Sequence, residues 1–277
     1  MPDQLDDLRR PPSRRRLWLA FLVLFAAFQL PEGLGQRVLH SLPVHAALSL
    51  AFLPLAWLVG RWLGFRGLDA WYLGRRAGWL ALLAAAFALA VLAKAAALAF
   101  GAGAGVYRIE ALPGLTLQQA AGAALLMLPY TFLPSIAEDV LTRGFLMRAA
   151  PVLARRWAFV VVSALLFVLN HIYRLANGPA EWAMLFCFGL AYAAALFYSR
   201  SLWPAVGLHW GWNYAGQLAD RVAGVEVLDR AAAAFVSPAA HLVLLALVVL
   251  CARRACRQGA RCPAASIASS TSPSTTR

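Results

Sequence analysis

Apolar runs long enough to cross a lipid bilayer recur along almost the entire chain. A transmembrane helix needs about 20 predominantly apolar residues, and 62% of the 277 residues are hydrophobic, well above the usual composition of a soluble domain. We therefore expect an all-α fold, a polytopic membrane protein whose transmembrane helices form one bundle. Eight helices are expected, at roughly residues 17–34, 39–60, 77–100, 116–142, 157–175, 181–199, 203–219 and 236–252.

The formal net charge of +13 is due mainly to 24 arginines, and a chain this basic can bind nucleic acid. The arginines, however, are spread over alternate loops and do not gather on one soluble module. They are dense before residue 17, in 61–76, in 143–156 and after residue 252, and sparse in the other loops. Because basic loops face the cytoplasm, we expect a multi-pass protein of the inner (plasma) membrane with both termini cytoplasmic. Its expected partner is the lipid bilayer, with no nucleic acid.

Both ends of the chain lie outside the expected bundle of residues 17–252. Residues 1–16 form a basic, cytoplasmic N-terminal segment. No small-residue cleavage site follows the next apolar run, so we interpret that run as an uncleaved first span and not as a signal peptide. Residues 253–277 become rich in serine and threonine and are expected to form a disordered cytoplasmic tail.

Glu138 and Asp139 are adjacent acids deep within an apolar segment, where a carboxylate is costly and is therefore a candidate functional residue. Asp139 and Arg143 are four residues apart, so they share a helix face in the order that favours an ion pair. Glu138 is rotated from Asp139 by about 100°, which leaves it free to project into a cavity as a general base. The alternative is that both acids only neutralise Arg143 and Arg148 inside the bundle.

Two histidine pairs follow at helical spacing: Phe167 with His171, and His209 with Asn213. Asn170 is expected to point about 100° away from His171. Each pair has a simpler explanation, because a histidine at a helix end can act as a cap, and His and Asn commonly join membrane helices by hydrogen bonds. Since each polar pair costs stability in a membrane, three of them on three helices indicate one polar cavity.

Gly207 and Gly211 form a small-x-x-x-small pattern that permits close approach of two helices. The remaining histidines, His40, His45 and His241, have no polar partner three or four residues away that could make a site. We expect them to be interfacial or core residues.

The ordered set Glu138-Asp139-x-x-x-Arg143-Gly144, Phe167-x-x-x-His171 and His209-x-x-x-Asn213 resembles the CPBP family. These are CAAX-processing and bacteriocin-processing intramembrane endopeptidases, also called the abortive-infection family. The resemblance covers roughly residues 115–220, which would form the catalytic core. The family usually has two glutamates in the first motif, whereas the second acid is Asp139 here. A shorter carboxylate should be tolerated at a position that pairs with Arg143.

The resemblance implies a protease that hydrolyses a peptide bond of a membrane-associated protein or peptide. Carried over by position, Glu138 and His171 would activate the attacking water, and His209 and Asn213 would stabilise the oxyanion. Asp139, Arg143 and Phe167 would be structural supports.

Members of the family have been described both as metalloproteases and as metal-free glutamate proteases. A metalloendopeptidase could hold zinc with Glu138, His171 and His209, but the chain has no His-Glu-x-x-His motif, and we favour the glutamate mechanism without a cofactor. Two alternatives remain. One is a non-catalytic immunity or scaffold protein that binds a peptide in the same cavity. The other is a small transporter, which predicts a repeat between the halves of the chain that is not evident.

Overall fold

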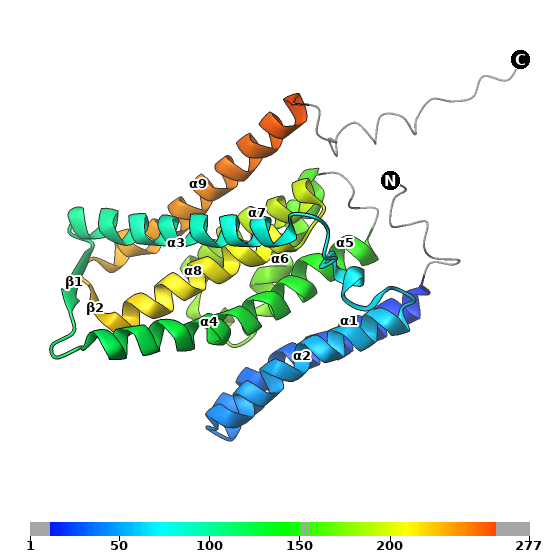
Figure 1. The fold of residues 1–277 in the computed structure, drawn as a ribbon, viewed down its shortest axis with the longest axis horizontal. Coiled ribbons are helices and arrows are strands. Elements are labelled where there is room, and N and C mark those ends of the chain that lie inside the picture. Colours follow the sequence, from blue (N-terminus) through cyan, green and yellow to red (C-terminus); the bar gives the residue numbers. More distant parts are fainter. Residues whose placement is uncertain (1–11, 151–152, 154–155, 259–277) are drawn as a thin grey trace, which may run out of the picture.

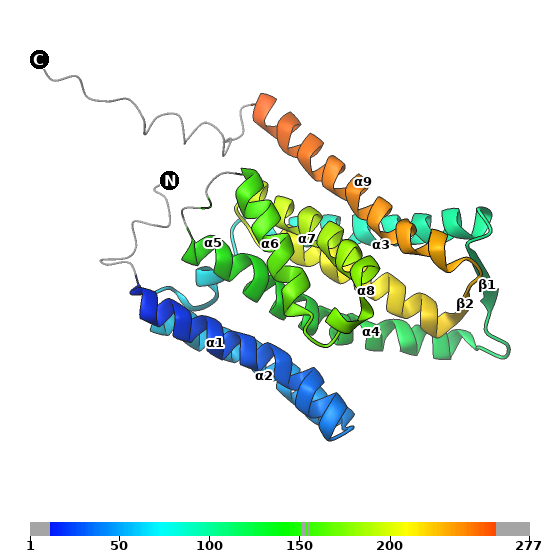
Figure 2. The same cartoon turned by 180° about the vertical axis from the view of Figure 1, so that it is seen from behind.

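The computed structural model describes residues 12–150, 153 and 156–258, and in this part of the chain eight long helices form one bundle (Figure 1). α1 and α2 lie side by side along one edge of the bundle, and the C-terminal end of α9 points away from it in both views (Figures 1 and 2). The long helices are α1 (Arg14–Leu30), α2 (Leu42–Trp62), α3 (Trp79–Gly103), α4 (Leu117–Asp139), α6 (Arg156–Asn170), α7 (Pro179–Ser199), α8 (Trp203–Val222) and α9 (Arg230–Arg257).

Two of these helices continue through π-helical segments. α1 runs on as η1 (Pro31–Val38), and α4 runs through η3 (Val140–Gly144) into the short helix α5 (Phe145–Ala149). At the end of η3, the Phe145 amide donates to the Val140 carbonyl, the i→i+5 bond of a π-helix, which is often found at functional sites. The candidate acids therefore lie where the α-helical hydrogen-bond pattern of α4 changes.

The helix ends differ from expectation at several places. α6 ends at Asn170, not near residue 175, so that His171 lies just beyond the helix. α9 extends to Arg257, so residues 253–257 of the expected tail are helical, and α1 begins at Arg14 within the expected N-terminal segment. Residues 1–11 and 259–277, which make up most of the two expected terminal segments, lie outside the described residues.

Six segments of the described chain are long and apolar enough to cross a membrane, judged by length and composition. This confirms a multi-pass helical membrane protein. The other two expected spans are α6, which has 15 residues, and α8, which carries several polar side chains. At 1.5 Å per residue, α6 is only about 22 Å long. The six candidate spans are Arg14–Val38, Leu42–Trp62, Trp79–Gly103, Leu117–Ala149, Pro179–Ser199 and Arg230–Arg257.

A short antiparallel ribbon joins two loops of the bundle. β1 (Tyr107–Ala111) follows α3, β2 (Ala223–Val227) follows α8, and their register runs from Tyr107 opposite Val227 to Ala111 opposite Ala223. Arg108 and Glu226 lie opposite each other and form an exposed ion pair 2.7 Å long. The ribbon ties together the ends of α3 and α8 (Figure 1).

Glycines allow close helix contacts around α8 and α7. A Cβ atom added at Gly207 of α8 would lie 2.8 Å from Cβ of Ala86 in α3, and one added at Gly211 would also collide with the α3 backbone. The expected small-residue contact is thus confirmed, with α3 as the partner helix. A Cβ atom at Gly189 of α7 would similarly lie 2.9 Å from Cβ of Ala164 in α6. These contacts fix the positions of α6 and α8 within the bundle.

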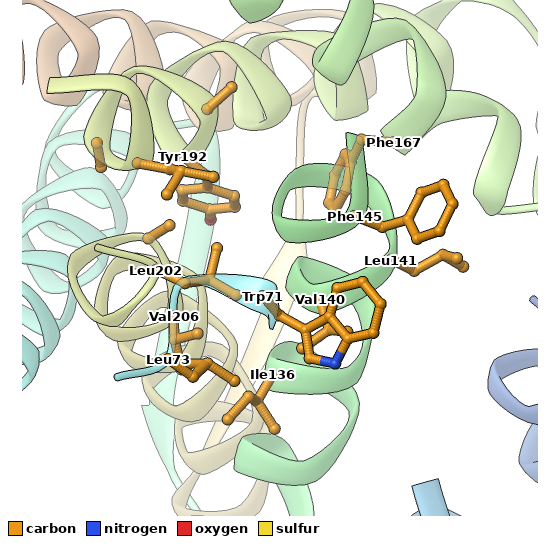
Figure 3. Packing of buried hydrophobic residues seen from close by; sticks show 14 of the residues in the cluster. Trp71, Leu73, Ile136, Val140, Leu141, Phe145, Phe167, Tyr192, Leu202 and Val206 are labelled. Carbon is orange, nitrogen blue, oxygen red and sulfur yellow. The ribbon is translucent and has the colours of Figure 1, made fainter. Parts of the chain in front are cut away.

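A buried cluster anchors the segment that follows the candidate acids (Figure 3). Trp71, at the end of the 3₁₀ segment Gly67–Trp71, is fully buried and stacks on Phe145 with ring centroids 5.9 Å apart. Figure 3 shows Val140 beside the Trp71 ring. At Gly144 an added Cβ would lie 2.9 Å from the Trp71 carbonyl oxygen, so only glycine fits there without a shift. The π-helical segment is therefore held firmly against the core.

Candidate active site

Asp139, the last residue of α4, is fully buried and forms the expected ion pair with Arg143. Its Oδ1 atom accepts a hydrogen bond from a terminal guanidinium nitrogen of Arg143, and the same Oδ1 lies 3.2 Å from Nδ1 of His209. The predicted pairing within the first motif is therefore present. Asp139 also holds a histidine of α8, which links the first motif to the third.

The Arg143 side chain is enclosed by aromatic rings. Its Cζ atom lies 4.5 Å from the centroid of the Phe167 ring and 5.1 Å from that of Tyr192, and a cation over a ring face is attracted more strongly when both are desolvated. Within the described residues, Asp139 Oδ2 and the Nε and Nη2 atoms of Arg143 have no hydrogen-bond partner. Asp139 is thus the carboxylate that balances the charge of Arg143 in this buried site.

The two candidate histidines are held by the same rings. Phe167 is edge-on to His171, with centroids 4.8 Å apart, and edge-on to His209, with centroids 5.6 Å apart. Tyr192 stacks on His209 at 4.9 Å with an interplanar angle of 21°. Phe167 thus contacts both imidazoles and the Arg143 guanidinium.

Glu138 lies between the two histidines and is only 5% exposed. Its Oε1 atom lies 3.3 Å from Nδ1 of His171, and its Oε2 atom lies 3.7 Å from Nε2 of His209. Within the described residues, no arginine or lysine forms an ion pair with Glu138, and Arg148 instead donates to backbone carbonyls of residues 69 and 70. The two acids therefore share the neighbour His209 but differ in that only Asp139 is paired with an arginine, so the alternative that both merely neutralise arginines does not hold.

Asn170 is a site residue whose orientation was predicted incorrectly. Its Nδ2 atom donates to Glu138 Oε1 at 3.0 Å, so it contacts the same oxygen that faces His171. The 100° estimate assumed a helix through both residues, but α6 ends at Asn170, and His171 lies between the helix end and the turn at residues 172–174. The usable signal in the sequence was a polar amide next to a histidine at the end of an apolar run.

Asn213 lies on the same helix as His209 but has a different partner. Its Nδ2 atom donates to Oγ of Ser135 at 3.2 Å, and Ser135, one turn before Asp139, is fully buried. The structure therefore brings Glu138, His171 and His209 together. It places Asn213 beside this group, bound to α4.

His241 of α9 is a core residue, as expected, but it also has a polar partner that its sequence neighbours did not reveal. Its Nδ1 lies 2.9 Å from the Ser237 carbonyl oxygen and its Nε2 lies 2.8 Å from the Tyr192 hydroxyl. A carbonyl only accepts, so Nδ1 carries the hydrogen and Tyr192 donates to Nε2. His241 thus fixes the ring that stacks on His209.

The Nδ1 atoms of both histidines among the candidate zinc ligands already have partners, so only their Nε2 atoms are left to bind a metal ion. Nδ1 of His171, the nitrogen nearest Glu138, lies 2.8 Å from the Phe167 carbonyl and therefore carries a hydrogen. Nδ1 of His209 is bound by Asp139. Among the described residues, no group of three His, Cys, Asp or Glu side chains is arranged to hold a metal ion.

Residues 120–215 match one family model, which is described as type II CAAX prenyl endopeptidase Rce1-like. A search of curated proteins and a search of solved structures each found no match. The matched segment contains the three motifs, while α1, α2, α3 and α9 lie outside it.

A buried cluster of carboxylates and histidines thus lies inside a multi-pass helical bundle, in the segment that matches the family model. The chain carries a domain of the Rce1-like type II CAAX prenyl endopeptidase family, part of the CPBP group. The resemblance noted from the three motifs is thereby confirmed.

Proposed function

We propose that this protein is an intramembrane endopeptidase that hydrolyses a peptide bond of a membrane-associated protein or peptide. One observation carries the proposal: Glu138 is a buried carboxylate with no arginine or lysine as ion-pair partner among the described residues, and it lies between two imidazoles. Burying an ionisable group in a membrane protein costs free energy, so such a group is by default a candidate functional residue. The family to which the domain belongs consists of peptidases, which supports the same conclusion.

Glu138 and His171 are the groups proposed to activate water. A water molecule next to Glu138 gives a proton to the carboxylate while its oxygen attacks the carbonyl carbon of the substrate. His171, 3.3 Å from Oε1, keeps the carboxylate oriented. When the C–N bond breaks, the proton passes from Glu138 to the leaving nitrogen. The carboxylate is then restored for the next reaction.

His209 and Asn213 are proposed to stabilise the oxyanion. Donors held in place before the reaction act strongly in a site that excludes water. Asp139 accepts a hydrogen bond from Nδ1 of His209, which directs Nε2 towards Glu138. Because Nδ1 carries this hydrogen, Nε2 donates to the oxyanion in the imidazolium form, in which both nitrogens are protonated. Asn213 gives one amide hydrogen to Ser135 and has a second one to donate. In this scheme Asp139, together with Arg143, supports His209 and has no contact with the substrate.

We propose that the reaction uses glutamate chemistry without a bound metal. The hydrogen bonding of His171 supports this proposal, because its Nδ1 atom faces both the Phe167 carbonyl oxygen and the Glu138 carboxylate. In this geometry the Glu138 carboxylate faces the N–H group of His171, and it can still accept a proton from water. A zinc-dependent reaction is the alternative, and it requires Glu138, His171 and His209 to rearrange around the ion.

The proposed orientation places both termini in the cytoplasm of a cell with this protein in its inner (plasma) membrane. It rests on the arginine-rich loops and on the even number of spans that eight helices provide. The β1–β2 ribbon would then lie on the outer side.

Protein termini created in the membrane provide the test, because this assay does not require the substrate to be known. The wild-type protein and a Glu138→Gln variant are expressed at matched levels in the same host, and new N- and C-termini of membrane proteins are identified by mass spectrometry. We expect termini that arise only with the wild type. If the two membranes give the same termini, the protein does not cut and is a binding or scaffold protein.

A further inference from the structure

We infer that Gln29 of α1 is a positioning residue for Glu138 and acts through Asn170. Gln29 is buried in the bundle, and its Nε2 atom donates to the Asn170 carbonyl at 2.8 Å and lies 3.3 Å from Asn170 Oδ1. Asn170 Nδ2 in turn donates to Glu138 Oε1 at 3.0 Å. The inference rests on the proposed role of Glu138 as the catalytic base.

Hydrogen-bond chemistry sets the direction of this chain of contacts. A backbone carbonyl only accepts, so the amide nitrogen of Gln29 must face Asn170. The oxygen of the Asn170 amide therefore faces Gln29, and its nitrogen faces the Glu138 carboxylate. If Gln29 could not donate, the Asn170 amide would lose one of the two contacts that fix its orientation. Glu138 would then be held less firmly.

Gln29 also supports the second group that contacts Glu138. The carbonyl that it binds belongs to Asn170, the last residue of α6, and the carbonyls at a helix end lack partners within the helix. His171 follows immediately, and its Nδ1 lies 3.3 Å from the same Oε1 atom. One side chain of α1 therefore restrains both neighbours of this carboxylate oxygen.

The inference gives α1 a role beyond anchoring the chain in the membrane. α1 lies outside residues 120–215, which match the family model, and its sequence alone shows only an apolar run with one glutamine near its end. Gln29 reaches the site from the side where α1 passes the end of α6. It is a buried polar residue that the proposed reaction itself does not use.

A double-mutant cycle tests the inference. Gln29→Met keeps a similar length but cannot donate, and Asn170→Ala removes the amide that links Gln29 to Glu138. Ser49→Ala on the neighbouring helix α2 is the control, because Ser49 is also buried but donates only to the His45 carbonyl of its own helix. Turnover is measured with purified protein and an internally quenched, farnesylated CAAX peptide, and thermal unfolding is measured on the same samples.

We expect Gln29→Met to lower kcat by roughly 3- to 10-fold, the effect of one net hydrogen bond, with KM unchanged. In the Asn170→Ala background the same substitution should have much less effect on kcat, and the effects on Tm should likewise be less than additive. Ser49→Ala should leave both constants as in the wild type. A merely structural role would lower Tm without this selective and non-additive loss of kcat.

The outcomes separate the two proposals. An active wild type with unchanged kcat in Gln29→Met, or with fully additive losses, overturns the inference about Gln29 and leaves the peptidase intact. A wild type that does not cut this peptide counts against the proposed function for prenylated peptides, and the Tm cycle then decides whether Gln29 and Asn170 are coupled. Additive Tm changes would overturn the inference in that case as well.

Discussion

Replacing Asp139 with alanine should destabilise the protein strongly because it leaves Arg143 buried without its counter-charge. Both side chains of the pair are completely buried, so water cannot screen the stranded guanidinium. Breaking a buried ion pair typically costs about 3–5 kcal/mol. For a chain of this size, where 1 kcal/mol shifts Tm by about 2–4 °C, the expected decrease in Tm is roughly 6–20 °C.

Thermal unfolding of detergent-purified variants measures this decrease directly. The matched control is Glu32→Ala, which removes one partner of the Glu32–Arg37 pair, whose side chains are 41% and 51% exposed. Exposed pairs contribute about 0–1 kcal/mol, so this variant should unfold close to the wild type. A double variant, Asp139→Ala with Arg143→Met, should unfold at a higher temperature than Asp139→Ala alone, because no charge is stranded. If Asp139→Ala unfolds like Glu32→Ala, or if the double variant is no more stable than the single one, a stranded charge on Arg143 is not what destabilises the protein.

Three further predictions concern the chemistry and the orientation. His209→Ala and Asn213→Ala should each lower kcat by about 10²–10³-fold, as for the loss of one oxyanion donor, while circular dichroism stays unchanged; a loss below about twofold would remove that residue from the mechanism. Exhaustive chelation of purified protein should leave most peptidase activity, with a zinc content well below one ion per chain; zinc that leaves and returns together with activity would contradict the glutamate mechanism. Gly103 and Arg76 are exposed positions that are expected to lie on opposite sides of the membrane. In a cysteine-free background, Gly103→Cys should react with a membrane-impermeant thiol reagent added outside, and Arg76→Cys should react only from the cytoplasm. The reverse pattern would invert the proposed orientation.

Local spacing in the sequence was enough to predict one ion pair of the site and one close helix contact. Asp139 and Arg143 pair because residues four apart share a helix face, and this relation holds even where α4 changes to a π-helix. Gly207 and Gly211 predicted a close helix contact for a similar reason, although only the structure shows that α3 is the partner. Apolar runs located all eight long helices in the described chain, because burial in lipid requires long apolar segments.

Contacts between distant segments could not be predicted in this way. Gln29 is 141 residues from Asn170, and Tyr192 is 49 residues from His241, so no helical period relates the members of either pair. The orientation of Asn170 was predicted incorrectly because it depends on where α6 ends, and helix ends are difficult to predict from an apolar pattern. The β1–β2 ribbon was missed since its five-residue strands come from loops more than a hundred residues apart.

The proposed role of Glu138 as the catalytic base is open to a test by one substitution. Glu138→Gln keeps the size of the side chain and its contact with Asn170 while removing its ability to accept a proton from water. Glu110→Gln, an exposed glutamate of β1, is the matched control. With proteins of equal Tm, we expect Glu138→Gln to abolish cleavage of the quenched peptide and Glu110→Gln to retain it. Cleavage by folded Glu138→Gln at a rate near that of the wild type would contradict the account.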